Sequence, residues 1–210
     1  MIIIGLTGGI ASGKSTTAAM FRELDIPVHD ADAAVHEMMA PEGAAVEKVV
    51  EAFGSQVLAQ DGSIDRQRLG GEVFAAPDRR KTLESIIHPL VATSRDSFLA
   101  ASRKDGAPLI VLDIPLLFET GGEAFCDFVI LCSVDGDIQK RRALLRNGMT
   151  EAKLDAILQS QMPLAIKRAK ADAVIETDHG TDAARQALLA ILNGPVRRLR
   201  ETKTADRRDA

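Results

Sequence analysis

The chain has few of the residues on which several common protein classes depend. Its 210 residues include no tryptophan or tyrosine and only seven phenylalanines, so we expect no platform on which nucleic-acid bases could stack. The formal net charge is −4, whereas proteins that bind nucleic acid by neutralising its phosphates are usually basic. The composition therefore argues against a nucleic-acid partner.

Cysteines and long apolar runs are also scarce. The two cysteines, Cys126 and Cys132, have the spacing of neither a metal site nor a disulfide framework, which favours small core residues in a reduced compartment. No run reaches the roughly 18 apolar residues of a membrane span. The apolar start, residues 1–6, is shorter than the core of a signal peptide. We expect a cytoplasmic protein without a membrane partner, as a monomer or weak homo-oligomer.

A glycine-rich segment directly after the apolar start is the most specific feature. Gly8, Gly13, Lys14 and Ser15 occupy the fixed positions of the pattern GxxxxGK[ST], which is typical of a phosphate-binding loop. A β-branched run precedes it, and an apolar stripe at helical spacing follows it. The alternative is a plain glycine-rich turn between a strand and a helix, but strand, loop and helix all agree with the motif.

The chemistry of this loop indicates a bound polyphosphate. Its backbone N–H groups and the helix N-terminus after it favour an anion. Lys14 is expected at the β- and γ-phosphates of ATP, and the Ser15 hydroxyl is expected to hold Mg²⁺. The nucleotide-binding residues predicted here are Gly8, Gly9, Ile10, Ala11, Ser12, Gly13, Lys14, Ser15 and Thr16.

Short apolar runs alternate with helical patterns along the rest of the chain. This alternation predicts an α/β fold with three layers and a mostly parallel, five-stranded sheet. We expect one domain over 1–194, with a core at about 1–32, 107–148 and 171–194. A helical insertion at about 33–106 and a lid at about 142–170 would bind substrates. The charged tail, 195–210, shows no periodicity, so disorder is expected there.

Acidic residues follow two of the predicted strands, where ligands gather in open parallel sheets. Asp30 and Asp32 follow the run 26–29, and each could serve the chemistry or cap the next helix. Asp113 closes the apolar run 109–112 and could orient Mg²⁺ or its waters, or anchor a turn. His88, just before Pro89, is either a ligand contact or a structural histidine.

An apolar loop and a pair of arginines complete the candidate residues. Leu116, Leu117 and Glu119 lie in the run Pro-Leu-Leu-Phe-Glu, and exposure of its apolar side chains would be costly, so packing beneath a substrate is expected. Arg142 and Arg146 are like charges four residues apart on a predicted helix, which favours an anion beside them. A solvated surface row is the alternative.

The absence of an NKxD-type run argues against a GTPase, because both asparagines are followed by glycine. A phosphate loop with a helical insertion and a late arginine-bearing segment is instead the layout of a small-molecule kinase. From Leu6 to about Asp178 the sequence resembles the dephospho-coenzyme A kinase family. The motifs that carry this resemblance are LTGGIxSGKS from Leu6, DAD from Asp30, FG at 53–54, DGxxDRxxL from Asp61, HP at 88–89, DxPLLFE from Asp113, QxxRxxxR from Gln139, Gln161, and ADxVI from Ala171.

The resemblance implies transfer of the ATP γ-phosphoryl group to the ribose 3′-hydroxyl of dephospho-coenzyme A, the last step of coenzyme A synthesis. In that family pattern Asp32 accepts the hydroxyl proton, while Lys14 and Arg142 are the other catalytic groups and Arg146 closes over the phosphates. Asp32, His88, Asp113, Leu116, Leu117 and Glu119 would contact the acceptor, and Ser15 and Asp113 would hold Mg²⁺.

Two departures from the family pattern are visible. Ala11 stands where the family often has glycine, which requires a negative φ there. Thr177 and Asp178 stand where the family usually has asparagine near the adenine. The rival functions are another kinase of this architecture, with a nucleoside, nucleotide or shikimate-like acceptor, and a non-catalytic ATP-binding regulatory module.

Overall fold

The computed structural model describes residues 1–74 and 76–206. The chain forms two compact units. Unit 1 consists of Met1–Val28 and Asp105–Ala210, and unit 2 is His29–Lys104. The helical insertion was predicted over 33–106, close to the bounds of unit 2.

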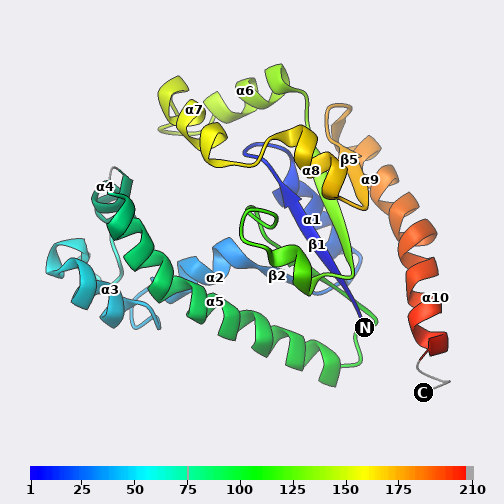
Figure 1. Ribbon diagram of the computed structural model, residues 1–210, viewed down its shortest axis with the longest axis horizontal. Helices are drawn as coiled ribbons and strands as arrows, with labels where there is room; N and C mark the ends of the chain where they lie inside the picture. Colours follow the sequence, from blue (N-terminus) through cyan, green and yellow to red (C-terminus); the bar gives the residue numbers. More distant parts are fainter. Residues whose placement is uncertain (75, 207–210) are drawn as a thin grey trace. The chain divides into compact units, whose positions relative to one another are not determined.

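A parallel sheet forms the centre of unit 1 (Figure 1). Strand β1 (Ile2–Gly8) pairs in parallel with β3 (Leu109–Asp113) and with β4 (Phe128–Ser133), and β4 pairs in parallel with β5 (Ala173–Glu176). With β2 (Val28–Asp30) the order is β2-β3-β1-β4-β5. Strands β3 and β4 are nearly continuously apolar, as expected for parallel strands that are covered on both faces. The predicted α/β fold with a mostly parallel five-stranded sheet is confirmed.

Helices α1 (Lys14–Glu23) and α9 (Gly180–Ile191) pack together and contribute Phe21, Met20 and Leu188 to the main core. A short 3₁₀ helix, η2 (Gly122–Phe125), precedes β4. The region predicted as a lid contains the end of α6 (Gly136–Leu144), then α7 (Glu151–Ser160) and α8 (Leu164–Lys170). Cys132 is buried and Cys126 is half-buried, and neither forms a disulfide.

The expected disorder of the tail is wrong for the part of it that the structure describes. A π-helical turn, η3 (Leu192–Val196), joins α9 to α10 (Arg197–Asp206), and the helices run end to end (Figure 1). Leu192, Val196 and Leu199 pack against the main core. Their spacing of four and three is a helical stripe, which the surrounding charges obscured. Residues 207–210 lie outside the described residues.

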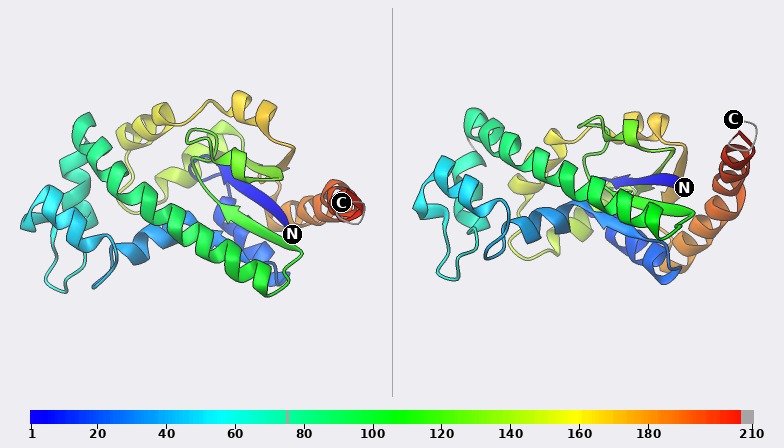
Figure 2. Two further views of the ribbon diagram at one scale, coloured as in Figure 1. Left: turned by 60° about the horizontal axis from the view of Figure 1, so that its bottom comes forward. Right: turned by 90° about the horizontal axis from the view of Figure 1, so that it is seen from below.

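Unit 2 is helical around its own apolar cluster. It contains α2 (Ala31–Met38), α3 (Val46–Phe53), the 3₁₀ turn η1 (Ser55–Val57), α4 (Arg66–Phe74) and α5 (Pro77–Lys104), which continues through Pro89. Figure 2 shows α2, α3 and α4 beside α5, which each of them contacts. In the described part of the chain no helix has the length and apolarity needed to cross a membrane.

Candidate active site

The glycine-rich segment forms a tight loop between β1 and α1. Gly13 caps α1 with φ of 83°, a left-handed conformation that glycine adopts at little cost. A side chain at position 13 would also collide with Thr177, whose atoms lie 2.9–3.1 Å from where a Cβ would be. Ser15 and Thr16 are exposed in the first turn of α1. The loop therefore leads into a helix N-terminus with a hydroxyl available to a ligand.

Ala11 departs from the expected backbone conformation. Its φ is +57° rather than negative, so the sequence-based expectation is wrong. Ser12 N–H donates to the Gly9 carbonyl oxygen over 3.2 Å, and Ala11 is the third residue of this turn, where a type II turn requires positive φ. A left-handed alanine costs roughly 1–2 kcal/mol. The loop therefore carries backbone strain at a buried position.

Lys14 and Asp113 meet at the carboxyl end of the sheet. Residues 6 and 113 are register partners of β1 and β3, which brings the end of β3 next to the start of the loop. Lys14 Nζ lies 2.5 Å from Asp113 Oδ1, and the two side chains are 13% and 1% exposed. The ion pair thus positions the Lys14 ammonium beside the loop, where it could contact a bound phosphate.

Arg142 is connected to the loop through Thr177. Its guanidinium donates to Thr177 Oγ1 over 3.0 Å and to the Thr177 carbonyl oxygen over 2.8 Å. Thr177 Oγ1 also lies 3.0 Å from the Ser12 carbonyl oxygen. Arg146 lies two residues beyond the end of α6, so the expectation that it shares one helix with Arg142 is wrong. It is exposed and makes no side-chain hydrogen bond or ion pair with the described residues.

Thr177 is a site residue whose structural role the sequence did not reveal. It appeared there only as a departure from a family pattern, yet it is buried between Arg142 and the loop. Its place directly after β5 was the available signal, because residues at the carboxyl ends of parallel strands gather at the ligand edge.

The apolar run 115–119 buries two of its side chains. Leu117 is fully buried and Phe118 nearly so, in a cluster with Val129, whereas Leu116 is 39% exposed. Leu117 therefore belongs to the core, and Leu116 is the member of the predicted pair that faces solvent. Contact of either leucine with a substrate stays a prediction.

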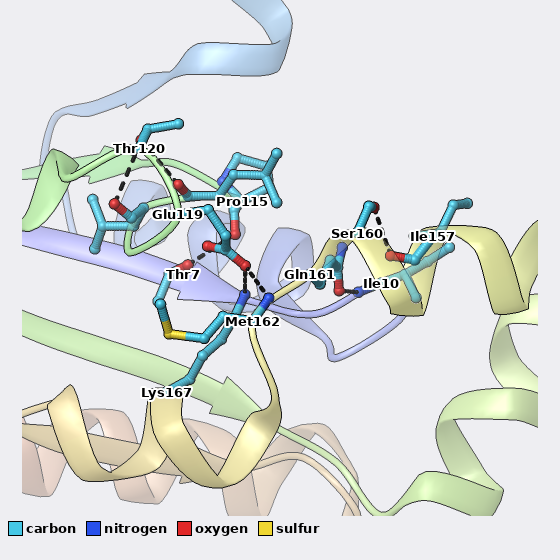
Figure 3. A network of polar contacts seen from close by, with 12 residues as sticks. Thr7, Ile10, Pro115, Glu119, Thr120, Ile157, Ser160, Gln161, Met162 and Lys167 are labelled. Carbon is cyan, nitrogen blue, oxygen red and sulfur yellow. Dashed lines mark hydrogen bonds and ion pairs between the residues drawn. The ribbon is translucent and has the colours of Figure 1, made fainter. Parts of the chain in front are cut away.

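The Glu119 carboxylate has partners inside unit 1 (Figure 3). Its Oε1 accepts from the Met162 backbone N–H over 2.7 Å and lies 2.8 Å from Lys167 Nζ. The side chains of Lys167 and Glu119 are 2% and 16% exposed. Burial alone would raise the pKa of Glu119, but the contacts from Lys167 and the Met162 N–H outweigh it and hold this pKa below its usual value.

Breaking this buried ion pair should destabilise the protein. Replacing Lys167 with methionine leaves the Glu119 carboxylate without its cation, and a fall of about 3–5 kcal/mol in the free energy of unfolding is expected. Lys140→Met is the matched control, because the side chains of Lys140 and Glu151 are 54% and 67% exposed and exposed ion pairs contribute little to stability. Urea unfolding measures both. Equal effects would contradict the assigned role of the buried pair.

The same pair predicts an acid sensitivity. Because the folded-state pKa of Glu119 is below its ordinary value of 4.5, the carboxylate stabilises the folded state above that value. This contribution is lost as the pH falls through the lowered folded-state pKa. Glu119→Gln combined with Lys167→Met should therefore show a shallower loss of stability between about pH 5 and pH 3. Identical pH profiles for the double variant and the unaltered protein would contradict the prediction.

The remaining predicted site residues, Asp32 and His88, lie in unit 2. Asp30 caps α2, since its Oδ1 accepts from the Ala33 N–H over 3.0 Å. Asp32 stands in the first turn of the same helix and is exposed. His88 is exposed within α5. Of the two alternatives for Asp30, the structure thus supports capping, and Asp32 keeps an exposed carboxylate.

Comparisons with known proteins match most of the chain to one family. A sequence model of the family described as dephospho-CoA kinase matches residues 2–183. The dephospho-CoA kinase of Mesorhizobium japonicum is 48% identical over 92% of this chain and 96% of its own length, and that of Geobacillus kaustophilus is 47% identical over 91% and 95%. A crystal structure of a Thermus thermophilus protein superposes with a TM-score of 0.79 at 34% identity, covering 92% of this chain and 97% of that one.

Proposed function

The chain belongs to the dephospho-CoA kinase family, and from that membership we propose that it transfers the γ-phosphoryl group of ATP to the ribose 3′-hydroxyl of dephospho-coenzyme A. The products are coenzyme A and ADP, and the family's reaction is the last step of coenzyme A synthesis. The observation that carries the proposal at the atomic level is the Lys14 and Asp113 pair beside a phosphate-loop sequence. It places a fixed positive charge beside the loop that the motif assigns to phosphates.

In the proposed reaction the phosphate loop and Lys14 bind the β- and γ-phosphates. The Asp32 carboxylate accepts the proton of the 3′-hydroxyl as its oxygen forms a bond to the γ-phosphorus. The bond from the γ-phosphorus to the bridging oxygen breaks, and ADP leaves. Arg142 and Arg146 neutralise charge on the transferring group, which is the main demand that phosphoryl transfer makes on a protein.

Ser15 and Asp113 are the residues proposed to hold Mg²⁺. The described residues contain no group of three or more His, Cys, Asp or Glu side chains that could hold a metal by themselves. Mg²⁺ is commonly bound by one or two protein oxygens together with substrate phosphates. When bound, the ion would neutralise charge on the β- and γ-phosphates. Asp113 is already paired with Lys14, so we propose that it acts on the ion through a water.

Unit 2 and the run 115–119 are proposed to receive the acceptor. His88 and Asp32 are exposed side chains of unit 2, and Leu116 is an exposed apolar side chain of unit 1. Glu119 is proposed to act by holding the segment at Met162, since its Oε1 is committed to that backbone and to Lys167. Cytoplasmic location and a monomeric or weakly oligomeric state stay predictions.

The acceptor can be identified by offering alternatives side by side. The protein is incubated with Mg·ATP and dephospho-coenzyme A, adenosine, a nucleoside monophosphate or shikimate, and ADP release is measured. Of the four acceptors, we expect only dephospho-coenzyme A to give rapid ADP release. Preference for another acceptor would assign a different kinase activity, and no turnover with any acceptor despite ATP binding would favour a regulatory module.

A further inference from the structure

Gln139 and Gln161 stand at motif positions to which the proposed chemistry gives no role, and both contact Ile10 of the phosphate loop. Gln139, on α6, donates from Nε2 to the Ile10 carbonyl oxygen over 2.8 Å. Gln161, directly after α7, accepts at Oε1 from the Ile10 N–H over 3.3 Å (Figure 3). The backbone of Ile10 is thus held at its N–H and at its carbonyl by side chains from two different helical segments.

Gly9 makes this double contact possible. A Cβ at position 9 would lie 2.9 Å from Gln139 Nε2 and 3.2 Å from Gln161 Oε1. No positive φ is recorded for Gly9, and a side chain at this position would displace the two glutamine amides from Ile10. Gly9, Gln139 and Gln161 also line one cavity of about 200 Å³ within unit 1.

The carbonyl that Gln139 binds belongs to the central peptide of the strained turn. Type I and type II turns differ in the orientation of the peptide between their second and third residues, here Ile10 and Ala11. In the observed orientation Ala11 has φ of +57°. Rotation of that peptide toward a type I turn would relieve Ala11, but it would turn the Ile10 carbonyl away from Gln139. The hydrogen bond from Gln139 therefore stabilises the turn in its strained conformation.

We propose that Gln139 and Gln161 are positioning residues that hold the Ile10 peptides in the orientation the phosphate loop needs, against the strain at Ala11. Because Gln139 shares α6 with Arg142, three residues later, the same contact links the loop to the helix that carries a phosphate-binding arginine.

The donor and acceptor roles of the two glutamines predict different responses to the same substitution. A glutamate at position 161 retains an acceptor for Ile10 N–H, whereas a glutamate at position 139 has no donor for the Ile10 carbonyl. Gln161→Glu should therefore bind Mg·AMP-PNP more tightly than Gln161→Met, while Gln139→Glu should bind no better than Gln139→Met. If charge alone mattered, both glutamate variants would bind more weakly than their methionine counterparts, which would overturn the proposal.

A double-mutant cycle tests the link to Ala11. Gln139→Met should weaken Mg·AMP-PNP binding about tenfold, measured by calorimetry without an acceptor. In an Ala11→Gly background the observed turn is no longer strained, so the same substitution should weaken binding about threefold or less. Gln159→Met, on the exposed face of α7, is the control and should leave affinity within about twofold.

Several outcomes would overturn the proposal. They are unchanged affinity in Gln139→Met, an equal loss in both backgrounds, or a loss fully explained by a lower melting temperature with normal affinity of the folded fraction. Should Gln139→Met not fold, hydrogen exchange of the Ile10 amide is measured in Gln161→Met. The proposal predicts faster exchange than in the unaltered protein, and unchanged exchange would contradict it. The inference takes from the proposed function only that ATP is the ligand. Failure of the unaltered protein to bind Mg·AMP-PNP would therefore refute the proposed function rather than the role of the two glutamines.

Discussion

Replacing Lys14 with methionine is expected to lower kcat by about a thousandfold or more, because an ammonium preorganised toward the transferring phosphates has no substitute in this loop. The fold should survive. Loss of the cation leaves Asp113, which is 1% exposed, without its ion pair, and this should reduce the free energy of unfolding by about 3 kcal/mol. A domain of this size commonly has about 5–15 kcal/mol in reserve.

The catalytic and structural effects of Lys14 can be separated with its partner. Lys14→Met combined with Asp113→Asn removes both charges, so most of the lost stability should return while activity stays low. Urea unfolding and steady-state kinetics of the same preparations measure the two quantities. Near-normal activity in Lys14→Met would remove the basis for assigning this loop to the phosphates of ATP.

Asp32→Asn is expected to lower kcat by roughly a hundredfold or more while ATP binding is retained, because the variant cannot accept the hydroxyl proton. The neighbouring Asp30 offers a matched control. Its side chain caps α2 by accepting from the Ala33 N–H, and asparagine caps helices about as well as aspartate. Asp30→Asn should therefore leave the free energy of unfolding nearly unchanged and keep kcat within a few-fold of that of the unaltered protein.

Steady-state kinetics with saturating Mg·ATP, together with calorimetric ATP binding, distinguishes the two aspartates. Equal losses of activity in both variants would point to a shared electrostatic effect of the segment rather than to one base. Full activity in Asp32→Asn would assign proton transfer to another group.

The sequence revealed those parts of the fold that depend on local patterns. The phosphate loop was recognisable because strand, glycines and helix follow one another within residues 1–24. The buried strands were recognisable because parallel strands covered on both faces are continuously apolar, as in Leu109–Asp113 and Phe128–Ser133. Asp30 was recognised as a candidate cap because capping joins residues only three apart.

What the sequence did not reveal depends on contacts between distant residues. Glu119 meets Lys167 and Thr177 meets Ser12 across long stretches of chain, and nothing local marks either pair. The positive φ of Ala11 depends on the whole turn rather than on alanine's own preference. Helix α10 was missed because its many charged residues obscured the short apolar stripe of Leu192, Val196 and Leu199, which packs against the core of unit 1.

The most direct test of the proposed reaction is a crystal structure with Mg·AMP-PNP and dephospho-coenzyme A bound together. We expect the triphosphate to lie in the loop with Lys14 Nζ at the γ-phosphate, and the ribose 3′-hydroxyl within roughly 2.6–3.2 Å of the Asp32 carboxylate. A triphosphate bound away from the loop, or an Asp32 carboxylate that contacts no acceptor hydroxyl, would contradict the account.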